Sequence, residues 1–305
     1  MRDVYGAGVL DCFLDEGISF PRAIGVSAGS GNLVSFLAGQ RGRNLRYYEQ
    51  YAPRPEYMGM KCLLKDGNYF NLEYIYGTMS REGGEDPVDY DALAASPVDF
   101  RVAACDARSG KTVFFKKSMI PRNDYRIIMA SCCVPAVCRP VEIGGRRFID
   151  GGTAIPIPWK KAFHDGADRI VVILTLRDDD ILEPVGHGLL YATLLAKYPK
   201  ALRILMNRHK TYNRQVEEIL RLEAEGKAVV IAPRDLYGVT KYDTGSRASP
   251  QALRRRISRR ARKDPFRRVR KPARGEITHP SISGRYMWTS RQRDIRSRQQ
   301  KSAKR

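Results

Sequence analysis

The chain of 305 residues has no long apolar run, and this absence argues against several classes of protein. Its longest mostly apolar stretch, residues 170–176, falls far short of the roughly 20 residues that a membrane-spanning helix needs. The first five residues lack the apolar segment of a secretory signal peptide. The sequence therefore argues against a transmembrane protein and predicts a cytoplasmic location, with peripheral contact with a membrane left open.

Metal-binding and disulfide patterns are also missing. The six cysteines include no CxxC pair, and no second pair or nearby histidine completes a metal site at Cys133 and Cys138. We therefore expect small buried thiols in a reducing compartment rather than a disulfide framework. With no P-loop and no ligand cluster of suitable spacing, the sequence predicts neither a metal nor a nucleotide cofactor.

Positive charge is abundant but confined to the end of the chain. The sequence has 54 Lys and Arg against 33 Asp and Glu, a net charge of +21. Residues 254–305 hold 20 of the basic and three of the acidic side chains, a balance of +17, and the other 253 residues carry only +4. Just 12 of these last 52 residues are apolar, too few to offset the entropy of ordering them. We predict a domain over residues 1–245 and a disordered basic tail over residues 246–305.

Residues 1–245 alternate between helical and extended patterns. Helical spacing of apolar residues predicts helices that end near Gly17 and Gly39, and further helices over 188–206 and 211–225. Short branched apolar runs bounded by Asp, Gly or Pro predict strands at 20–26, 100–105, 170–176 and 228–232. This alternation predicts an α/β domain with a mostly parallel central sheet.

A G-x-S-x-G motif, Gly25-Val26-Ser27-Ala28-Gly29, lies between the first predicted strand and the helix that follows it. A serine at such a tight turn needs small neighbours two residues away, here Gly25 and Gly29, because larger side chains would clash across the turn. The helix N-terminus favours the negative charge that develops during acyl transfer. An isolated match would more often be a plain turn, but the flanking strand and helix favour a nucleophile.

A second motif, Asp150-Gly151-Gly152, follows a predicted hairpin. Gly144 and Gly145 suit a hairpin turn, and residues 147–149 form a short strand that ends at Asp150. The open backbone around Asp150 would allow its carboxylate to reach a serine hydroxyl. By itself the motif is more often a solvated turn.

In their order along the chain, these blocks resemble the patatin-like phospholipases. The likeness rests on residues 1–10, on the two motifs, and on residues 130–135 with Pro140-Val141, and it spans roughly residues 1–245. It implies a three-layer α/β/α fold and a lipid acyl hydrolase that needs no cofactor, with a lipid ester as substrate. In that scheme Ser27 is the nucleophile and Asp150 the general base, and Gly151 and Gly152 support the turn.

The oxyanion loop of that family, G-G-G-x-R-G, is only partly matched. Arg2 matches its arginine, while Asp3 stands where the last glycine would be. Losing one oxyanion donor costs about 10²–10³ in rate, and a carboxylate at residue 3 would oppose the oxyanion. The family's first strand, which pairs near the middle of the sheet, is unmatched. We expect a longer native chain whose start lies upstream of Met1; a truncated and inactive product is the alternative.

Two further hypotheses stay open. A Ser-His-Asp triad would need a histidine downstream of the acid, for which His187 and His209 are formal candidates. Alternatively, the chain is an inactive remnant whose basic tail binds an anionic membrane or nucleic acid. Sparse aromatic residues in the tail argue against a stacking platform, so we expect no specific nucleic-acid partner and favour a solvated or frame-shifted tail. The oligomeric state is not predicted.

Two other features have a plain and a functional interpretation. Asp106 at a predicted strand end is more typical of a cap than of a catalytic acid. The Tyr- and Phe-rich segment over residues 47–76 is more typical of core packing than of an acyl-chain pocket or lid.

Overall fold

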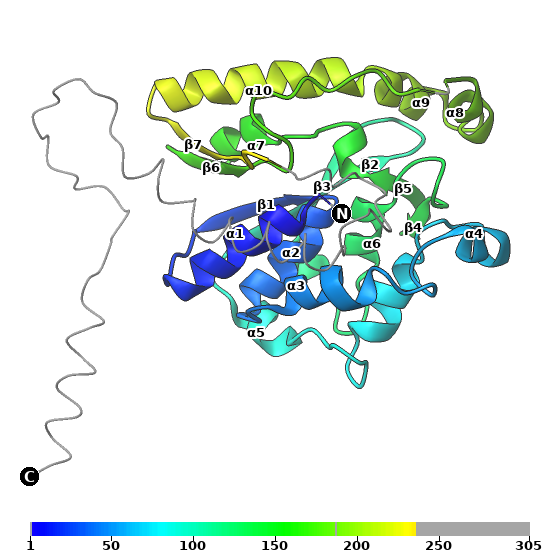
Figure 1. Cartoon of the computed structure of the whole chain (residues 1–305), viewed down its shortest axis with the longest axis horizontal. Coiled ribbons are helices and arrows are strands. Elements are labelled where there is room, and N and C mark those ends of the chain that lie inside the picture. The colour runs from blue at the N-terminus through cyan, green and yellow to red at the C-terminus, as the bar shows by residue number, and fades with distance from the viewer. Residues whose placement is uncertain (1, 187, 236–305) are drawn as a thin grey trace, which may run out of the picture. The chain divides into compact units, whose positions relative to one another are not determined.

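The computed structural model describes residues 2–186 and 188–235 (Figure 1). The predicted tail over residues 246–305 and the candidate His187 lie outside these residues. The α-helices of the described residues are α1 (Val4–Asp15), α2 (Ala28–Leu37), α3 (Arg43–Arg46), α4 (Met60–Asp66), α5 (Tyr90–Ala95), α6 (Arg126–Cys132), α7 (Trp159–His164), α8 (Gly188–Leu194), α9 (Pro199–Met206) and α10 (Arg208–Ala224). The strands are β1 (Arg22–Val26), β2 (Asp99–Asp106), β3 (Thr112–Lys116), β4 (Val141–Ile143), β5 (Arg146–Asp150), β6 (Ile170–Ile173) and β7 (Ala228–Ile231).

Five strands form one sheet around β2. Strand β1 runs parallel to β2 and pairs with its residues 99–103, while β5 runs antiparallel and pairs with residues 104–106. Strand β3 pairs antiparallel with residues 101–105. Because β3 occupies one edge of β2 over that length, β1 and β5 must share the opposite edge. The two strands therefore meet there with their carboxyl ends facing each other.

A second, two-stranded sheet is formed by β6 and β7, which are parallel. Helices lie on both sides of the strands, with α1, α2 and α6 on one side and α10 on the other (Figure 1). The predicted α/β class is confirmed. In the larger sheet β1 and β2 form a parallel pair, and the pairs β2–β3, β2–β5 and β4–β5 are antiparallel. Within the described part of the chain, β1 pairs only with β2.

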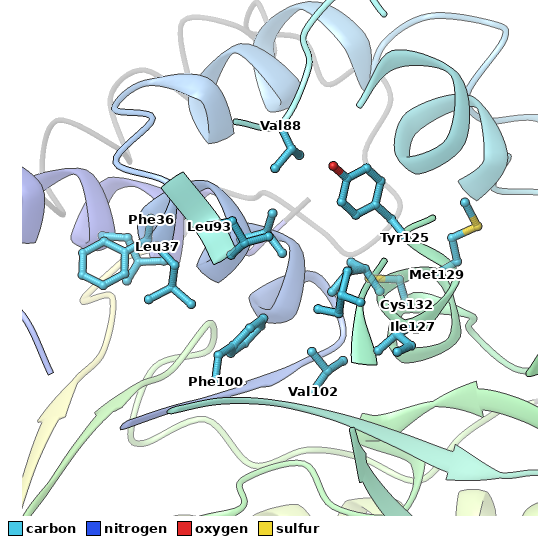
Figure 2. Close-up of a cluster of buried hydrophobic side chains, with 14 of the residues drawn as sticks. Phe36, Leu37, Val88, Leu93, Phe100, Val102, Tyr125, Ile127, Met129 and Cys132 are labelled. Carbon is cyan, nitrogen blue, oxygen red and sulfur yellow. The ribbon is translucent and has the colours of Figure 1, made fainter. Parts of the chain in front are cut away.

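The main core lies between the larger sheet and its helices. Figure 2 shows side chains of α2, α5 and α6 gathered over Phe100 and Val102 of β2. Both β2 residues are fully buried, as are Val4 and Val9 of α1. Burying one such side chain contributes about 1.5–3 kcal/mol, so this cluster fixes the helices against the sheet that carries both motifs.

Glycines end the first two long helices where the sequence predicts it. Gly17 and Gly39 have φ values of +66° and +68°, the left-handed conformation typical of a helix C-terminus. The predicted single helix over residues 188–206 is instead divided into α8 and α9, because Pro199 begins a new helix and cannot continue the preceding one. None of the helices in the described ranges combines the length and apolar character needed to cross a bilayer.

Candidate active site

Ser27 occupies the sharp turn between β1 and α2. Its φ of 54° and ψ of −136° are unusual for a residue with a side chain, and such strain is typical of functional sites. The backbone N–H of Ser27 donates a hydrogen bond of 2.9 Å to Ser131 Oγ, and Ser131 donates one of 2.7 Å to the carbonyl of Ala103. Ser131 is completely buried. A side chain of α6 thus anchors the strained turn to β2.

The two glycines of the G-x-S-x-G motif differ in their surroundings. A Cβ atom at Gly25 would lie 2.5 Å from Ser30 Cα, so only glycine lets α2 pack this closely on β1. A Cβ atom at Gly29 would meet nothing within 4 Å. The expected clash is therefore present at Gly25, whereas at Gly29 it is absent, because the first turn of α2 points this position away from the strand.

Asp150 lies next to Ser27. Ser27 Oγ donates a hydrogen bond of 2.5 Å to Asp150 Oδ2, and Asp150 is only 7% exposed. The contact follows from the sheet, since Val26 pairs with Ala103 and Asp150 with the next residue of β2, Ala104. Two strands that end face to face on one edge bring residues 123 positions apart in sequence into contact.

The glycines after Asp150 shape the turn that holds its carboxylate. Asp150 Oδ1 accepts a hydrogen bond of 2.7 Å from the N–H of Gly152. A Cβ atom at Gly151 would lie 2.2 Å from the carbonyl oxygen of Ala103, so this position requires glycine. The Gly152 carbonyl in turn accepts a hydrogen bond of 2.7 Å from Arg208 Nε. Both oxygens of Asp150 are thus held, one by the turn and one by the serine.

Arg2 and Asp3 lie just before α1. The Nε atom of Arg2 is enclosed without a hydrogen-bond partner among the described residues. Asn32 Nδ2 donates a hydrogen bond of 2.7 Å to Asp3 Oδ2, and burial raises the pKa of Asp3 to about 7. Part of the Asp3 population is therefore neutral near pH 7, which weakens the repulsion that a carboxylate here would exert on an oxyanion.

We expect Asp3→Asn to stabilise the protein at pH 8 by about 2–4 kcal/mol and to have little effect near pH 4. Between about pH 4 and pH 7 the unfolded Asp3, with its pKa near 4, is ionised while the folded one still holds its proton, so the stability of the wild type falls as the pH rises through this range. Urea denaturation at both pH values measures the difference, with the exposed Asp91→Asn as the control. A stabilisation by Asp3→Asn that did not change with pH would contradict this expectation.

No described histidine contacts the dyad of Ser27 and Asp150. His209 lies on α10, and its Nδ1 atom is enclosed and without a hydrogen-bond partner among the described residues. His164 on α7 is exposed beside Asp165. The Ser27 hydroxyl therefore donates to a carboxylate and not to an imidazole.

Asp106 has a structural role, as its position at a strand end predicts. It accepts a hydrogen bond from the N–H of Ser109 and two from the guanidinium of Arg146. Burial by itself would raise the pKa of Asp106, but these partners outweigh burial and lower it. The six cysteines are buried free thiols, and residues 2–186 and 188–235 contain no group of three potential ligands that could hold a metal ion.

The aromatic segment over residues 47–76 builds a small core of its own, which includes Tyr51, Tyr57 and Ile75. It also lines a cavity of about 30 Å³ together with Ala28, the residue after the nucleophile. The buried aromatic cluster supports core packing, the plainer of the two interpretations of this segment.

Two residues of the site, Ser131 and Arg208, are not indicated by any pattern in the sequence. Ser131 belongs to a block that resembles the family, but nothing in the block shows that its hydroxyl holds the turn at Ser27. Arg208 stands in a charged stretch that is typical of a solvated helix face, and no local pattern distinguishes it from the neighbouring basic residues. Only the packing of α10 brings it to Gly152.

Comparison with known proteins shows the family of the chain. Residues 1–163 match the family model described as patatin-like phospholipase, and residues 198–246 match a domain of unknown function, DUF6363. The "uncharacterized protein YjjU" of Escherichia coli is 26% identical over 224 residues, which are 72% of this chain and 61% of that protein. The chain thus spans about three fifths of the length of this relative.

A second relative is the "uncharacterized NTE family protein Rv1063c" of Mycobacterium tuberculosis. It is 29% identical over 82 residues, which cover 27% of this chain and 22% of that protein. The patatin model covers more than half of the chain and contains both motifs. The chain therefore belongs to the patatin-like phospholipase family, a family of lipid hydrolases.

Proposed function

We propose that the protein is a serine acyl hydrolase that cleaves ester bonds of phospholipids or other lipids, with Ser27 as nucleophile and Asp150 as general base. The observation that carries this proposal is the 2.5 Å hydrogen bond between Ser27 Oγ and Asp150 Oδ2. A general base must lie within hydrogen-bond reach of the proton that it removes, and this carboxylate does. The strained conformation of Ser27 supports the same role.

The reaction proceeds in two steps. Ser27 Oγ attacks the ester carbonyl carbon while Asp150 Oδ2 accepts its proton, and the tetrahedral intermediate collapses as that proton passes to the leaving alcohol. Water then attacks the acyl-enzyme with Asp150 again accepting a proton. Release of the fatty acid returns that proton to Ser27 and restores the dyad.

The negative charge that forms on the carbonyl oxygen needs hydrogen-bond donors. The first N–H groups of α2 have no acceptor within the helix, and they begin directly after Ser27. Together with the positive end of the helix dipole they provide part of an oxyanion hole. Arg2 matches the arginine of the family's oxyanion loop. We therefore assign the remaining hydrogen-bond donors of the oxyanion hole to the segment around Arg2.

A fluorophosphonate probe tests the proposal, because it reacts with an activated serine whatever the lipid head group. We expect the folded protein to be labelled at Ser27, with the modified residue identified by peptide mass spectrometry. Ser27→Ala removes the label, whereas Ser118→Ala, at an exposed serine elsewhere in the chain, keeps the nucleophile and serves as the control. Hydrolysis of phospholipid and monoacylglycerol substrates then defines the ester class.

Absence of labelling on correctly folded wild-type protein would defeat the proposal. That outcome favours the inactive remnant, whose binding to anionic vesicles or nucleic acid would depend on the basic residues after 254. Salt-sensitive binding by the full chain, combined with an unreactive Ser27, would identify this second function.

A further inference from the structure

We infer that α10, within the segment matched by the domain of unknown function, positions the catalytic aspartate through Arg208. This inference rests on the proposed function, in which Asp150 is the general base. Arg208 does not touch the reacting atoms, and we assign it a positioning role.

A continuous chain of hydrogen bonds leads from Arg208 to the nucleophile. Arg208 Nε donates to the Gly152 carbonyl at 2.7 Å, and the Gly152 N–H donates to Asp150 Oδ1 at 2.7 Å. Ser27 Oγ donates to the other oxygen, Asp150 Oδ2, at 2.5 Å. Gly152 is therefore held on one side by Arg208 and itself holds the carboxylate on the other.

The turn is buried and is also held by backbone hydrogen bonds, since the Asp150 N–H donates one of 2.7 Å to the Cys133 carbonyl and the Ile155 N–H donates one of 2.9 Å to the Gly151 carbonyl. Glycine has no side chain to pack and more backbone freedom than any other residue, and two glycines follow Asp150 directly. A charge-assisted hydrogen bond from a guanidinium is stronger than a neutral one and directional. Arg208 thus adds a charge-assisted restraint on the carbonyl of Gly152, the residue whose N–H holds Asp150 Oδ1.

Further contacts show that α9 and α10 are fixed against this part of the domain. Buried Gln215 Oε1 accepts a hydrogen bond of 3.0 Å from the N–H of Ile157, a few residues after the turn. Trp159 Nε1 donates one of 3.1 Å to Glu218. Ala201 of α9 is fully buried against Cys105 and Ile149. The guanidinium therefore extends from a rigid support.

The functional consequence is geometric. Displacing a catalytic group by about 1 Å can cost roughly 10²-fold in rate. We therefore expect Arg208→Ala to lower kcat by about 10- to 100-fold and to change KM less than threefold, because substrate contacts stay intact. Arg208→Lys keeps the charge but not the planar donor, and we expect it to restore only part of the loss.

Kinetics on a soluble ester and hydrogen–deuterium exchange, both on the full chain, test the inference together. Arg208→Ala is expected to accelerate amide exchange at residues 150–153 and to regain part of its kcat in methylguanidine. The matched control is Arg214→Ala, an exposed position on the same helix, which should change neither quantity. If the alanine variant folds poorly, the kinetics and the hydrogen–deuterium exchange are measured on Arg208→Lys instead.

The outcomes separate this inference from the proposed function. Unchanged exchange at residues 150–153 would overturn the inference, as would a kcat equal to that of Arg214→Ala. A raised KM at constant kcat would also overturn it, since Arg208 would then bind substrate. If Ser27 of the wild type does not react with the probe, the proposed function fails, and the exchange experiment still decides whether Arg208 holds the turn.

Discussion

Replacing Asp150 with asparagine is expected to lower kcat for ester hydrolysis by about 10²–10⁴-fold, the range typical of losing a general base. Asparagine has nearly the same volume, and its Oδ1 can still accept the hydrogen bond from Gly152. Its amide cannot take the proton of Ser27 Oγ, so the loss isolates the chemical role of the carboxylate. Steady-state kinetics and the rate of fluorophosphonate labelling should fall together.

Asp106→Asn is the matched control for this variant. Asp106 also ends a strand of the same sheet, but its partners are Ser109 and Arg146, and it takes no part in the proposed mechanism. We expect its kcat to stay within a few-fold of the wild type. If Asp150→Asn kept its activity while His187→Ala lost it, a histidine-based mechanism would replace the dyad.

Replacing Gly25 with alanine is expected to destabilise the fold by about 1–3 kcal/mol or more, the cost typical of overpacking. The new Cβ atom would lie 2.5 Å from Ser30 Cα and 3.0 Å from Ser30 N, which are backbone atoms and cannot rotate away. The only relief is to move α2 off β1, and that movement carries Ser27 with it. Urea denaturation measures the stability, and probe labelling reports the displacement of Ser27.

Gly29→Ala, in the same motif, provides the comparison. A Cβ atom there has no neighbour within 4 Å, and alanine is favoured over glycine inside a helix by about 1 kcal/mol. We expect this variant to be at least as stable as the wild type. Equal destabilisation by the two substitutions would mean that the turn, and not the packing of α2 on β1, requires glycine.

Local patterns in the sequence were sufficient to identify the elements that carry the site. Apolar spacing gave α1, α2 and α10 to within a few residues, because each buries one face and ends at a residue that cannot continue it. The pair Gly144 and Gly145 marked the β4–β5 hairpin, since both have positive φ as a two-residue turn requires. The apolar spacing predicts one helix over residues 188–206, whereas the structure has α8 and α9, although Pro199 in the sequence indicates a helix boundary.

Contacts between distant residues were beyond such patterns. Ser131 and Arg208 are part of the site because α6 and α10 pack where they do, and neither residue differs locally from a solvated serine or arginine. The same limit applies to Gly29, whose place in the motif suggested a clash that the direction of α2 removes. The raised pKa of Asp3 likewise results from burial in the folded chain, which outweighs the hydrogen bond from Tyr48 that by itself lowers this pKa.

The sequence by itself determined the α/β class, the two motifs and the family, because these follow from local periodicity, turn chemistry and the order of short blocks. The meeting of Ser27 with Asp150 was decided only in three dimensions. It depends on the register of β1 and β5 along one edge of β2, where Val26 and Asp150 pair with the adjacent residues Ala103 and Ala104. Register is set by long-range strand pairing, so the distance between nucleophile and base belongs to the tertiary structure.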